Sequence, residues 1–166
     1  TDKGYTVYIT SWVNPDESYS KTSYDDYAEL GILEPLDFIY KENNKKSVNM
    51  VGYCIGGTLL SSVLSYLTEN KKDDKVKSAT YLTTLVDFSH PGEIGVFIDD
   101  EQLDVLEDNI RKQGYLEGKE MAIIFSVLRA NEMIWSFVVN NYLLGKEPFP
   151  FDILYWNSDS TNMPAE

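Results

Sequence analysis

The segment that most constrains the fold is a six-residue sequence, Gly-Tyr-Cys-Ile-Gly-Gly, at positions 52–57. The residues before it, Ser47–Tyr53, form a short run typical of a strand, and Ile55–Thr68 is small and apolar with helical spacing. A strand that turns directly into a helix crowds its own backbone, and glycine tolerates this crowding because it has no Cβ. We therefore predict a sharp strand–turn–helix with Cys54 at the turn.

The pattern G-x-C-x-G-G is the cysteine form of a nucleophile elbow. Gly52 and Gly56 would leave room for the crowded turn, and Gly57 would let the helix lie close to the strand. The positive end of the helix favours the thiolate of Cys54. The backbone N–H of Ile55 would donate to the oxyanion that forms when the thiolate attacks a carbonyl. The alternative interpretation is a buried structural cysteine at a tight turn.

Strands and helices alternate in the first half of the chain, which indicates an α/β fold. The predicted elements are strands at Tyr5–Trp12, Ser47–Tyr53 and Val76–Phe88, a helix of about four turns that begins after Ser23 and a helix at Ile55–Thr68. Ser23 and Asp26 resemble a capping box at the start of the first helix. This alternation implies a parallel sheet with helices on both faces.

The pattern changes after Phe88, where His-Pro-Gly at 90–92 interrupts it. Helices are predicted from about Asp100 to Lys112, Gly118 to Leu128 and Asn131 to Leu144, and the aromatic segment Phe151–Asn157 is expected to pack back on the sheet. We therefore expect three parts: a partial α/β core at 1–89, a helical insertion at 90–150 and a return segment at 151–166.

A nucleophilic thiol needs a base, which is usually a histidine oriented by a carboxylate. The single histidine, His90, follows the strand after the elbow helix too closely for the order nucleophile, acid, histidine. We interpret it as a loop histidine, and its role stays open. Asp87, near the end of the same strand, is a candidate for lining the site, or a residue that only hydrogen-bonds at the strand end.

Composition excludes several classes of protein. The net charge of −13 argues against nucleic-acid binding, and the acidic runs at Asp25–Glu42 and Asp99–Asp108 are interpreted as solvated helix faces. One cysteine and one histidine form neither an internal disulfide nor a zinc site with the usual ligand spacing, so no metal is expected. We see no signal peptide and no apolar run long enough to cross a membrane. The start lacks Met, as if the chain were cut from a longer protein.

Several blocks, in order along the chain, resemble class I polyhydroxyalkanoate synthases. They are Tyr8–Trp12 with Asn14–Asp16, Gly52–Thr58, Leu82–Ser89, Ile134–Trp135 with Val138–Leu143, and Pro150–Thr161. Val13 and Ala130 stand where the family is expected to have Arg and Pro, which indicates a divergent member.

The resemblance implies an α/β-hydrolase core with a helical cap, the latter at 90–150. It implies polymerisation of (R)-3-hydroxyacyl-coenzyme A, typically 3-hydroxybutyryl-coenzyme A, with Cys54 carrying the growing chain as a thioester and coenzyme A released. It also implies a homodimer formed through the cap, attachment to polyester granules in the cytoplasm, and no cofactor. Because the chain is acidic, an anionic coenzyme A ester would need local Lys or Arg contacts.

The family's catalytic Asp and His lie beyond Glu166, so the resemblance implies that this chain is inactive alone. Two alternatives are a cysteine hydrolase of the dienelactone-hydrolase type and a non-catalytic dimerisation module. The aromatic residues that favour the dimerisation module are Trp135, Phe137, Phe149 and Phe151. The preferred length of the hydroxyacyl group, and whether the chain folds or dimerises alone, stay open.

Overall fold

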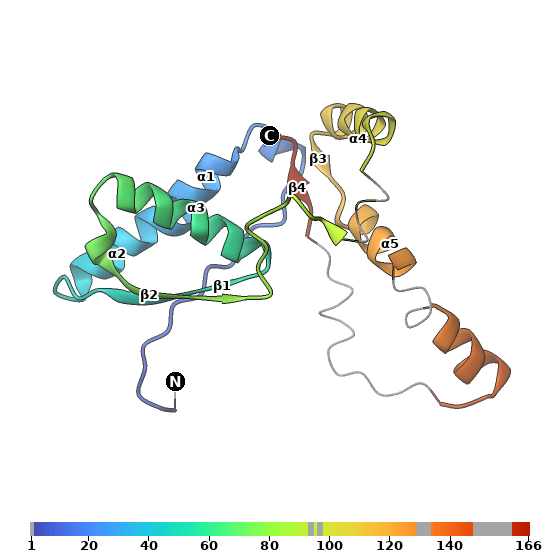
Figure 1. Cartoon of the computed structure of the whole chain (residues 1–166), viewed down its shortest axis with the longest axis horizontal. Helices are drawn as coiled ribbons and strands as arrows, with labels where there is room; N and C mark the ends of the chain where they lie inside the picture. Colours follow the sequence, from blue (N-terminus) through green and yellow to red (C-terminus); the bar gives the residue numbers. More distant parts are fainter. Residues whose placement is uncertain (1, 93–94, 96–97, 129–133, 148–160) are drawn as a thin grey trace. The chain divides into compact units, whose positions relative to one another are not determined.

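The computed structural model describes residues 2–92, 95, 98–128, 134–147 and 161–166. The chain forms two compact units, of which the first contains residues 1–13 and 22–90 and the second contains residues 14–21 and 91–166 (Figure 1). The predicted division into a core, a cap and a return segment stays a prediction.

The first unit is a parallel sheet with helices. Its elements are α1 (Tyr24–Ala28), η2 (Glu29–Leu33), α2 (Glu34–Glu42), β1 (Val48–Tyr53), α3 (Ile55–Glu69), η3 (Asp73–Lys75) and β2 (Val76–Leu82). Strands β1 and β2 pair in parallel, with Tyr53 opposite Leu82 at the end of the sheet. Parallel strands need a crossover connection, and α3 supplies it. The predicted α/β class is confirmed.

The helix that begins after Ser23 is capped as predicted. The Ser23 hydroxyl accepts the N–H of Asp26 at 3.3 Å, and the Asp26 carboxylate accepts the N–H of Ser23 at 2.8 Å. The predicted four-turn helix is divided by η2, which has π-helical geometry. Gly31 within η2 is buried under the ring of Trp12, which occupies the space that a Cβ would need. The π-helical turn therefore lies where the Trp12 ring packs against the helix.

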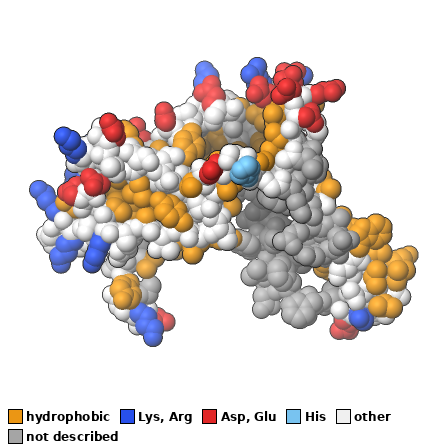
Figure 2. Space-filling model, viewed as in Figure 1, with side chains coloured by type: hydrophobic (Ala, Val, Ile, Leu, Met, Phe, Trp, Pro, Cys, Tyr) orange, Lys and Arg blue, Asp and Glu red, His pale blue; other side chains and the backbone are white. Residues whose placement is uncertain are grey.

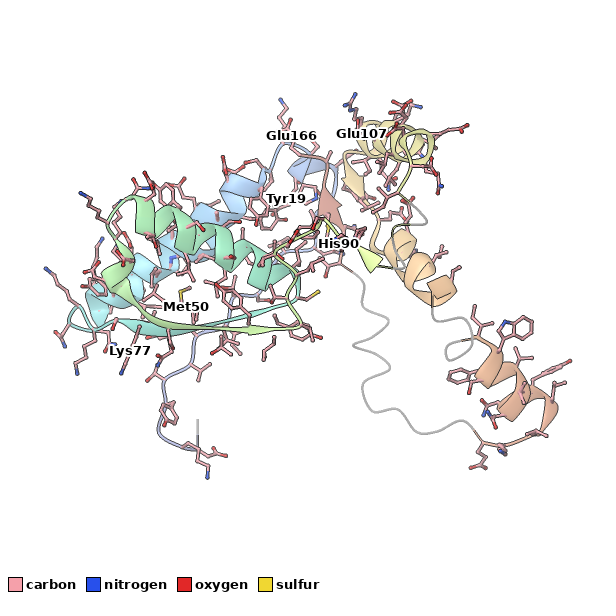
Figure 3. All side chains as sticks on the ribbon, in the orientation of Figure 1. Tyr19, Met50, Lys77, His90, Glu107 and Glu166 are labelled. Carbon is pink, nitrogen blue, oxygen red and sulfur yellow. The ribbon has the colours of Figure 1, made fainter. Side chains whose placement is uncertain are left out.

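The core lies between the helices and one face of the sheet. Leu36 of α2 and Val63 and Leu67 of α3 form its centre. The partly buried residues around them are Ala28, Ile32, Leu33, Val48, Met50, Leu64 and Val76. Figure 3 shows Met50 on the helix side of the sheet and Lys77 on the other side. Because side chains alternate along a strand, the buried face of β1 is accompanied by an exposed one.

The exposed face of the sheet is apolar at its carboxyl end. Val51 and Tyr53 of β1 are 66% and 60% exposed, and Leu82 of β2 is 48% exposed. Coverage of both faces was predicted, whereas the helices of the first unit lie on one face of its sheet.

The predicted strand at Tyr5–Trp12 is wrong. Residues 5–12 have no regular secondary structure, and Ile9 is 87% exposed. A strand forms only when its backbone groups pair with those of a neighbouring strand. In the described residues β1 and β2 pair with each other and not with residues 5–12. The segment is held near its end, where the Trp12 and Tyr27 ring centroids are 5.2 Å apart and Thr10 donates to the carbonyl of Gly31.

The second unit is mostly helical. Its elements are η1 (Glu17–Tyr19), α4 (Asp100–Gln113), β3 (Tyr115–Leu116), α5 (Gly118–Leu128), η6 (Val138–Leu143) and β4 (Met163–Pro164), which pairs antiparallel with β3. The helices predicted at 100–112 and 118–128 are confirmed. The described part of the third, residues 134–143, is helical, whereas Phe151–Asn157 lies outside the described residues.

Both ends of α4 have capping residues. The Asp99 carboxylate accepts the N–H of Gln102 at 2.9 Å, and Gly114 ends the helix at φ +86°. Acidic side chains gather over this helix (Figure 2), in agreement with a solvated helix face.

Asn162 joins three segments of the second unit. Its backbone N–H donates to the Asn14 side chain at 2.7 Å, its side-chain amide donates to the Pro15 carbonyl at 3.0 Å, and its side-chain oxygen accepts the N–H of Gly118 at 3.0 Å. These bonds connect the last described segment, residues 161–166, to residues that are distant from it in the sequence.

Candidate active site at the strand–helix turn

Cys54 lies between β1 and α3, as the N-cap residue of the helix. Its φ of +50° and ψ of −126° fall outside the regions that side-chain-bearing residues normally adopt. Such a conformation costs of order 1–3 kcal/mol and persists only where the surrounding structure holds it. The thiol is free and exposed, so the strained residue presents its thiol to solvent.

Backbone hydrogen bonds hold the turn on both sides. The N–H of Cys54 donates to the carbonyl of Leu82 at 2.9 Å, which ties the turn to the end of β2. The carbonyl of Cys54 accepts the N–H of Gly57 at 2.9 Å and that of Thr58 at 3.4 Å. The strained residue is thus fixed between the neighbouring strand and the first turn of α3.

Two of the three glycines lie where the chain is crowded. A Cβ on Gly52 would stand 2.5 Å from the Cα of Gly57, and a Cβ on Gly57 would occupy the place of the Thr84 hydroxyl. Gly56 differs from the prediction, because a Cβ there would meet nothing within 4 Å. The close approach is therefore between Gly52 and Gly57, and Gly56 faces open space.

The first turn of α3 supplies hydrogen-bond donors beside the thiol. The N–H groups of Ile55 and Gly56 occupy the first two helical positions, where a helix offers no carbonyl partner of its own. The first turn contains no acidic residue, so no side chain of this turn opposes the positive end of the helix. An oxygen that gains negative charge beside Cys54 would be stabilised here.

The chain that leaves β2 crosses this turn. Thr83 has a φ of +48°, a genuine outlier for a β-branched residue, and it ends β2 at Leu82 instead of the predicted Phe88. The Thr84 hydroxyl donates to the carbonyl of Leu82 at 3.2 Å, and the Thr58 hydroxyl donates to the carbonyl of Leu85 at 2.7 Å.

Sequence reasoning did not single out Thr58, Thr83 or Thr84. A signal was present, because the carboxyl ends of neighbouring parallel strands meet at one edge of a sheet. The two threonines that follow β2 therefore had to lie near the cysteine that follows β1.

Asp87 and His90 do not complete a triad. The Asp87 carboxylate accepts the N–H of Ser89 at 3.0 Å, and the hydrogen bonds from the Ser89 backbone and side chain lower the pKa of Asp87 below its usual 3.8. His90 is exposed on the loop after β2 (Figures 2 and 3). In the described part of the chain, neither residue hydrogen-bonds to Cys54. Asp87 thus serves its own loop as an ionised hydrogen-bond acceptor.

An open groove of about 370 Å³ lies at the other end of α3. Its lining residues are Glu29, Leu33, Glu34, Asp37, Phe38, Lys41, Tyr66, Leu67, Lys72 and Lys75. Lys75 and Asp37 form an ion pair across it. None of the predicted site residues lines this groove.

Within the described ranges, no group of His, Cys, Asp and Glu side chains is placed to hold a metal ion. No helix in those ranges combines the length and the apolar character needed to cross a membrane.

A parallel sheet, a strained residue between strand and helix and a free thiol at that turn define the class of the chain. It belongs to the α/β-hydrolase fold family, which matches residues 1–166. Within this class, it is similar to the poly(3-hydroxyalkanoate) polymerase subunit of Rhizobium meliloti strain 1021, with 51% identity over 99% of the chain and 27% of that protein. This similarity confirms the resemblance noted from the sequence blocks.

Two further relatives agree. The poly(3-hydroxyalkanoate) polymerase of Methylorubrum extorquens is 47% identical over 98% of the chain, and the polymerase subunit of Cupriavidus necator is 37% identical over 99%. The matched part is 27% and 28% of these proteins, so the chain spans about a quarter of the length of the relatives it matches.

Proposed function

We propose that the chain is the nucleophile-bearing part of a polyhydroxyalkanoate synthase, an acyltransferase that polymerises (R)-3-hydroxyacyl-coenzyme A. The observation that carries the proposal is the strained, exposed Cys54 at the N-terminus of α3. A similarity to named polymerases over nearly the whole chain supports it. The typical substrate would be 3-hydroxybutyryl-coenzyme A.

In the first step, the Cys54 thiolate attacks the carbonyl carbon of the coenzyme A thioester. The developing oxyanion accepts the backbone N–H of Ile55, at the first helical position of α3. The intermediate collapses, the bond between the carbonyl carbon and the coenzyme A sulfur breaks, and the acyl group remains on Cys54. Coenzyme A leaves as a thiolate and takes up the proton that a general base had removed from the Cys54 thiol. One thioester replaces another, so the step needs little driving force.

In the second step, the hydroxyl of another hydroxyacyl unit attacks the thioester on the enzyme. An ester bond forms, the bond to the Cys54 sulfur breaks, and the hydroxyl proton passes to a base. We propose that this base is a histidine, oriented by an aspartate, in a part of the protein beyond Glu166. His90 makes no hydrogen bond to Cys54 and is not assigned the role.

We further propose that the protein acts as a homodimer formed through the helical part at 90–150 and is attached to polyester granules in the cytoplasm. Exposed apolar side chains in the second unit support a contact role. Ile123, Trp135 and Phe137 are 64%, 58% and 56% exposed. Aromatic and aliphatic side chains of this kind are enriched in the buried centres of interfaces.

The experiment is release of coenzyme A from (R)-3-hydroxybutyryl-coenzyme A by a full-length protein that carries this sequence. Cys54→Ala is expected to lower turnover by at least about 1,000-fold, since it removes the nucleophile. His90→Ala is the control and is expected to keep the activity. The 166-residue chain alone is expected to show no turnover.

Three results would contradict the proposal. Turnover that survives Cys54→Ala would show that Cys54 is not the nucleophile. Turnover by the short chain, lost in His90→Ala, would show that the base is His90. Small hydroxy acids in place of insoluble polyester would indicate a cysteine hydrolase.

A further inference from the structure

We propose that Thr58 is a positioning residue for the reaction: its hydroxyl holds the chain that leaves β2 against the turn containing Cys54. The inference rests on the proposed role of Cys54 as nucleophile and adds a residue whose side-chain hydroxyl bonds to the carbonyl of Leu85. Thr58 lies in the first turn of α3, four residues after Cys54.

Residues 82–85, here called the crossing segment, make three contacts with the elbow. The Leu82 carbonyl accepts the N–H of Cys54 at 2.9 Å. The Thr84 side chain fills the space above Gly57 that a Cβ would otherwise need. The Leu85 carbonyl accepts the Thr58 hydroxyl at 2.7 Å, a typical distance for a well-formed O–H···O bond.

The Thr58 bond closes the far end of the crossing segment. Leu82 is still in β2 and is held by the sheet, but the chain turns away at Thr83, whose φ is +48°. A threonine in this conformation relaxes unless its neighbours prevent it. The bond from Thr58 to Leu85 is a side-chain contact that keeps the segment folded over α3.

The strain at Thr83 is connected to the strain at Cys54. The residue before Thr83 accepts the Cys54 N–H, so movement of the crossing segment loosens one of the three backbone hydrogen bonds that hold Cys54 at φ +50°. A relaxed Cys54 would turn its sulfur away from the N–H groups at the start of α3. Those groups stabilise negative charge that develops beside them, so the reactivity of the thiol should fall.

The test is the rate at which iodoacetamide alkylates Cys54 in the folded chain, where it is the only cysteine. Thr58→Val keeps the shape of the side chain and removes the hydrogen bond, and is expected to slow alkylation roughly fivefold, within the range that one hydrogen bond supplies. Thr58→Ser restores a hydroxyl and is expected to return the rate to that of the wild type.

Thr68→Val is the matched control. Thr68 lies on the same helix and donates to the helix carbonyl of Leu64 at 2.9 Å, so this substitution also removes one threonine hydroxyl bond. It is expected to leave the alkylation rate unchanged. If Thr58→Val does not fold, Thr84→Ala, which empties the space above Gly57, is expected to slow alkylation in the same way.

In the full-length protein, Thr58→Val is expected to lower kcat and leave KM for the coenzyme A ester unchanged. Equal alkylation rates in Thr58→Val and the wild type would overturn the inference, as would failure of Thr58→Ser to restore the rate. These outcomes are separate from the proposed function, because alkylation reports on the elbow even if coenzyme A release proves independent of Cys54.

Discussion

At the scale of single residues, the geometry of the elbow requires glycine only where a Cβ would overlap a neighbouring part of the backbone. Gly52 is buried, and the atoms closest to a Cβ placed there belong to the backbone of Gly57 and Gly56. Backbone atoms cannot move aside without separating α3 from β1. Gly56, four residues further along the chain, faces open space with an ordinary helical φ. The two glycines that flank Cys54 in the motif therefore have different roles.

Gly52→Ala and Gly56→Ala should separate these roles. Gly52→Ala is expected to destabilise the chain by about 3 kcal/mol or more, because the new methyl group overlaps backbone. Gly56→Ala is expected to change stability by less than about 0.5 kcal/mol, since alanine suits a helix and meets no neighbour. Urea unfolding followed by circular dichroism measures both. A Gly52→Ala chain as stable as the Gly56→Ala chain would contradict the close approach.

At the scale of elements, the capping box before α1 makes helix stability depend on pH. Hydrogen bonds from the Ser23 backbone N–H and hydroxyl lower the pKa of Asp26 below its usual 3.8. A lowered pKa in the folded state means that the carboxylate stabilises the fold above pH 3.8. That contribution is lost as the pH falls through the pKa of the folded state.

Asp26→Asn is therefore expected to unfold at lower urea than the wild type at pH 7, with the difference disappearing near about pH 2. Asp25→Asn is the control, because it removes a neighbouring charge and leaves the Ser23 bonds in place. Ser23→Ala is expected to cost about 1 kcal/mol at pH 7, the usual value for a lost N-cap. A difference between Asp26→Asn and the wild type that persists at low pH would rule out the carboxylate as its source.

Local signals explain which elements were predictable. Helices α3, α4 and α5 were predicted to within about one residue because their apolar spacing and end residues act within the helix itself. The strand at Tyr5–Trp12 was not, because β-branched and aromatic composition indicates a preference and a strand also requires a partner. The end of β2 was missed for a similar reason, since Thr83 takes its conformation from contacts with the elbow.

The candidate site was likewise predictable only where its residues are close together in the sequence. Cys54 and the helix N-terminus follow from one contiguous motif, whereas the crossing segment joins the elbow from the next strand. The meeting of the two strand ends indicated that Thr84 lies near Cys54, but no local pattern indicated its contact with Gly57 or the bond from Thr58 to Leu85. The role of Gly56 was misjudged because the motif alone does not tell which glycine faces the strand.

At the scale of the whole molecule, an acidic chain exposes apolar side chains at the carboxyl end of its sheet. A net charge of −13 opposes association of the chain with itself, whereas Val51, Tyr53 and Leu82 favour it. Salt weakens the repulsion between charges and leaves apolar contacts intact. The chain is therefore expected to associate as the salt concentration rises.

Val51→Lys should reduce this association by placing a charge on the exposed sheet face. Leu30→Lys is the control, because it adds the same charge at an exposed apolar position of η2, outside the sheet and outside the helical part at 90–150. Light scattering at low and high salt, at equal protein concentration, measures the effect. Equal suppression by both variants would point to net charge as the cause, and no suppression by Val51→Lys would exclude the sheet face.

The bond between the Cys54 N–H and the Leu82 carbonyl also determines when, during synthesis, Cys54 can take its strained conformation. During synthesis, Cys54 emerges before any residue of β2 exists, so nothing yet holds it in its strained conformation. The cysteine becomes an elbow only when the following strand pairs with β1 and the chain turns across α3. In a nascent chain the exposed thiol would therefore lack its strained conformation until translation has passed Leu82, because the contact that holds the residue comes from the next strand.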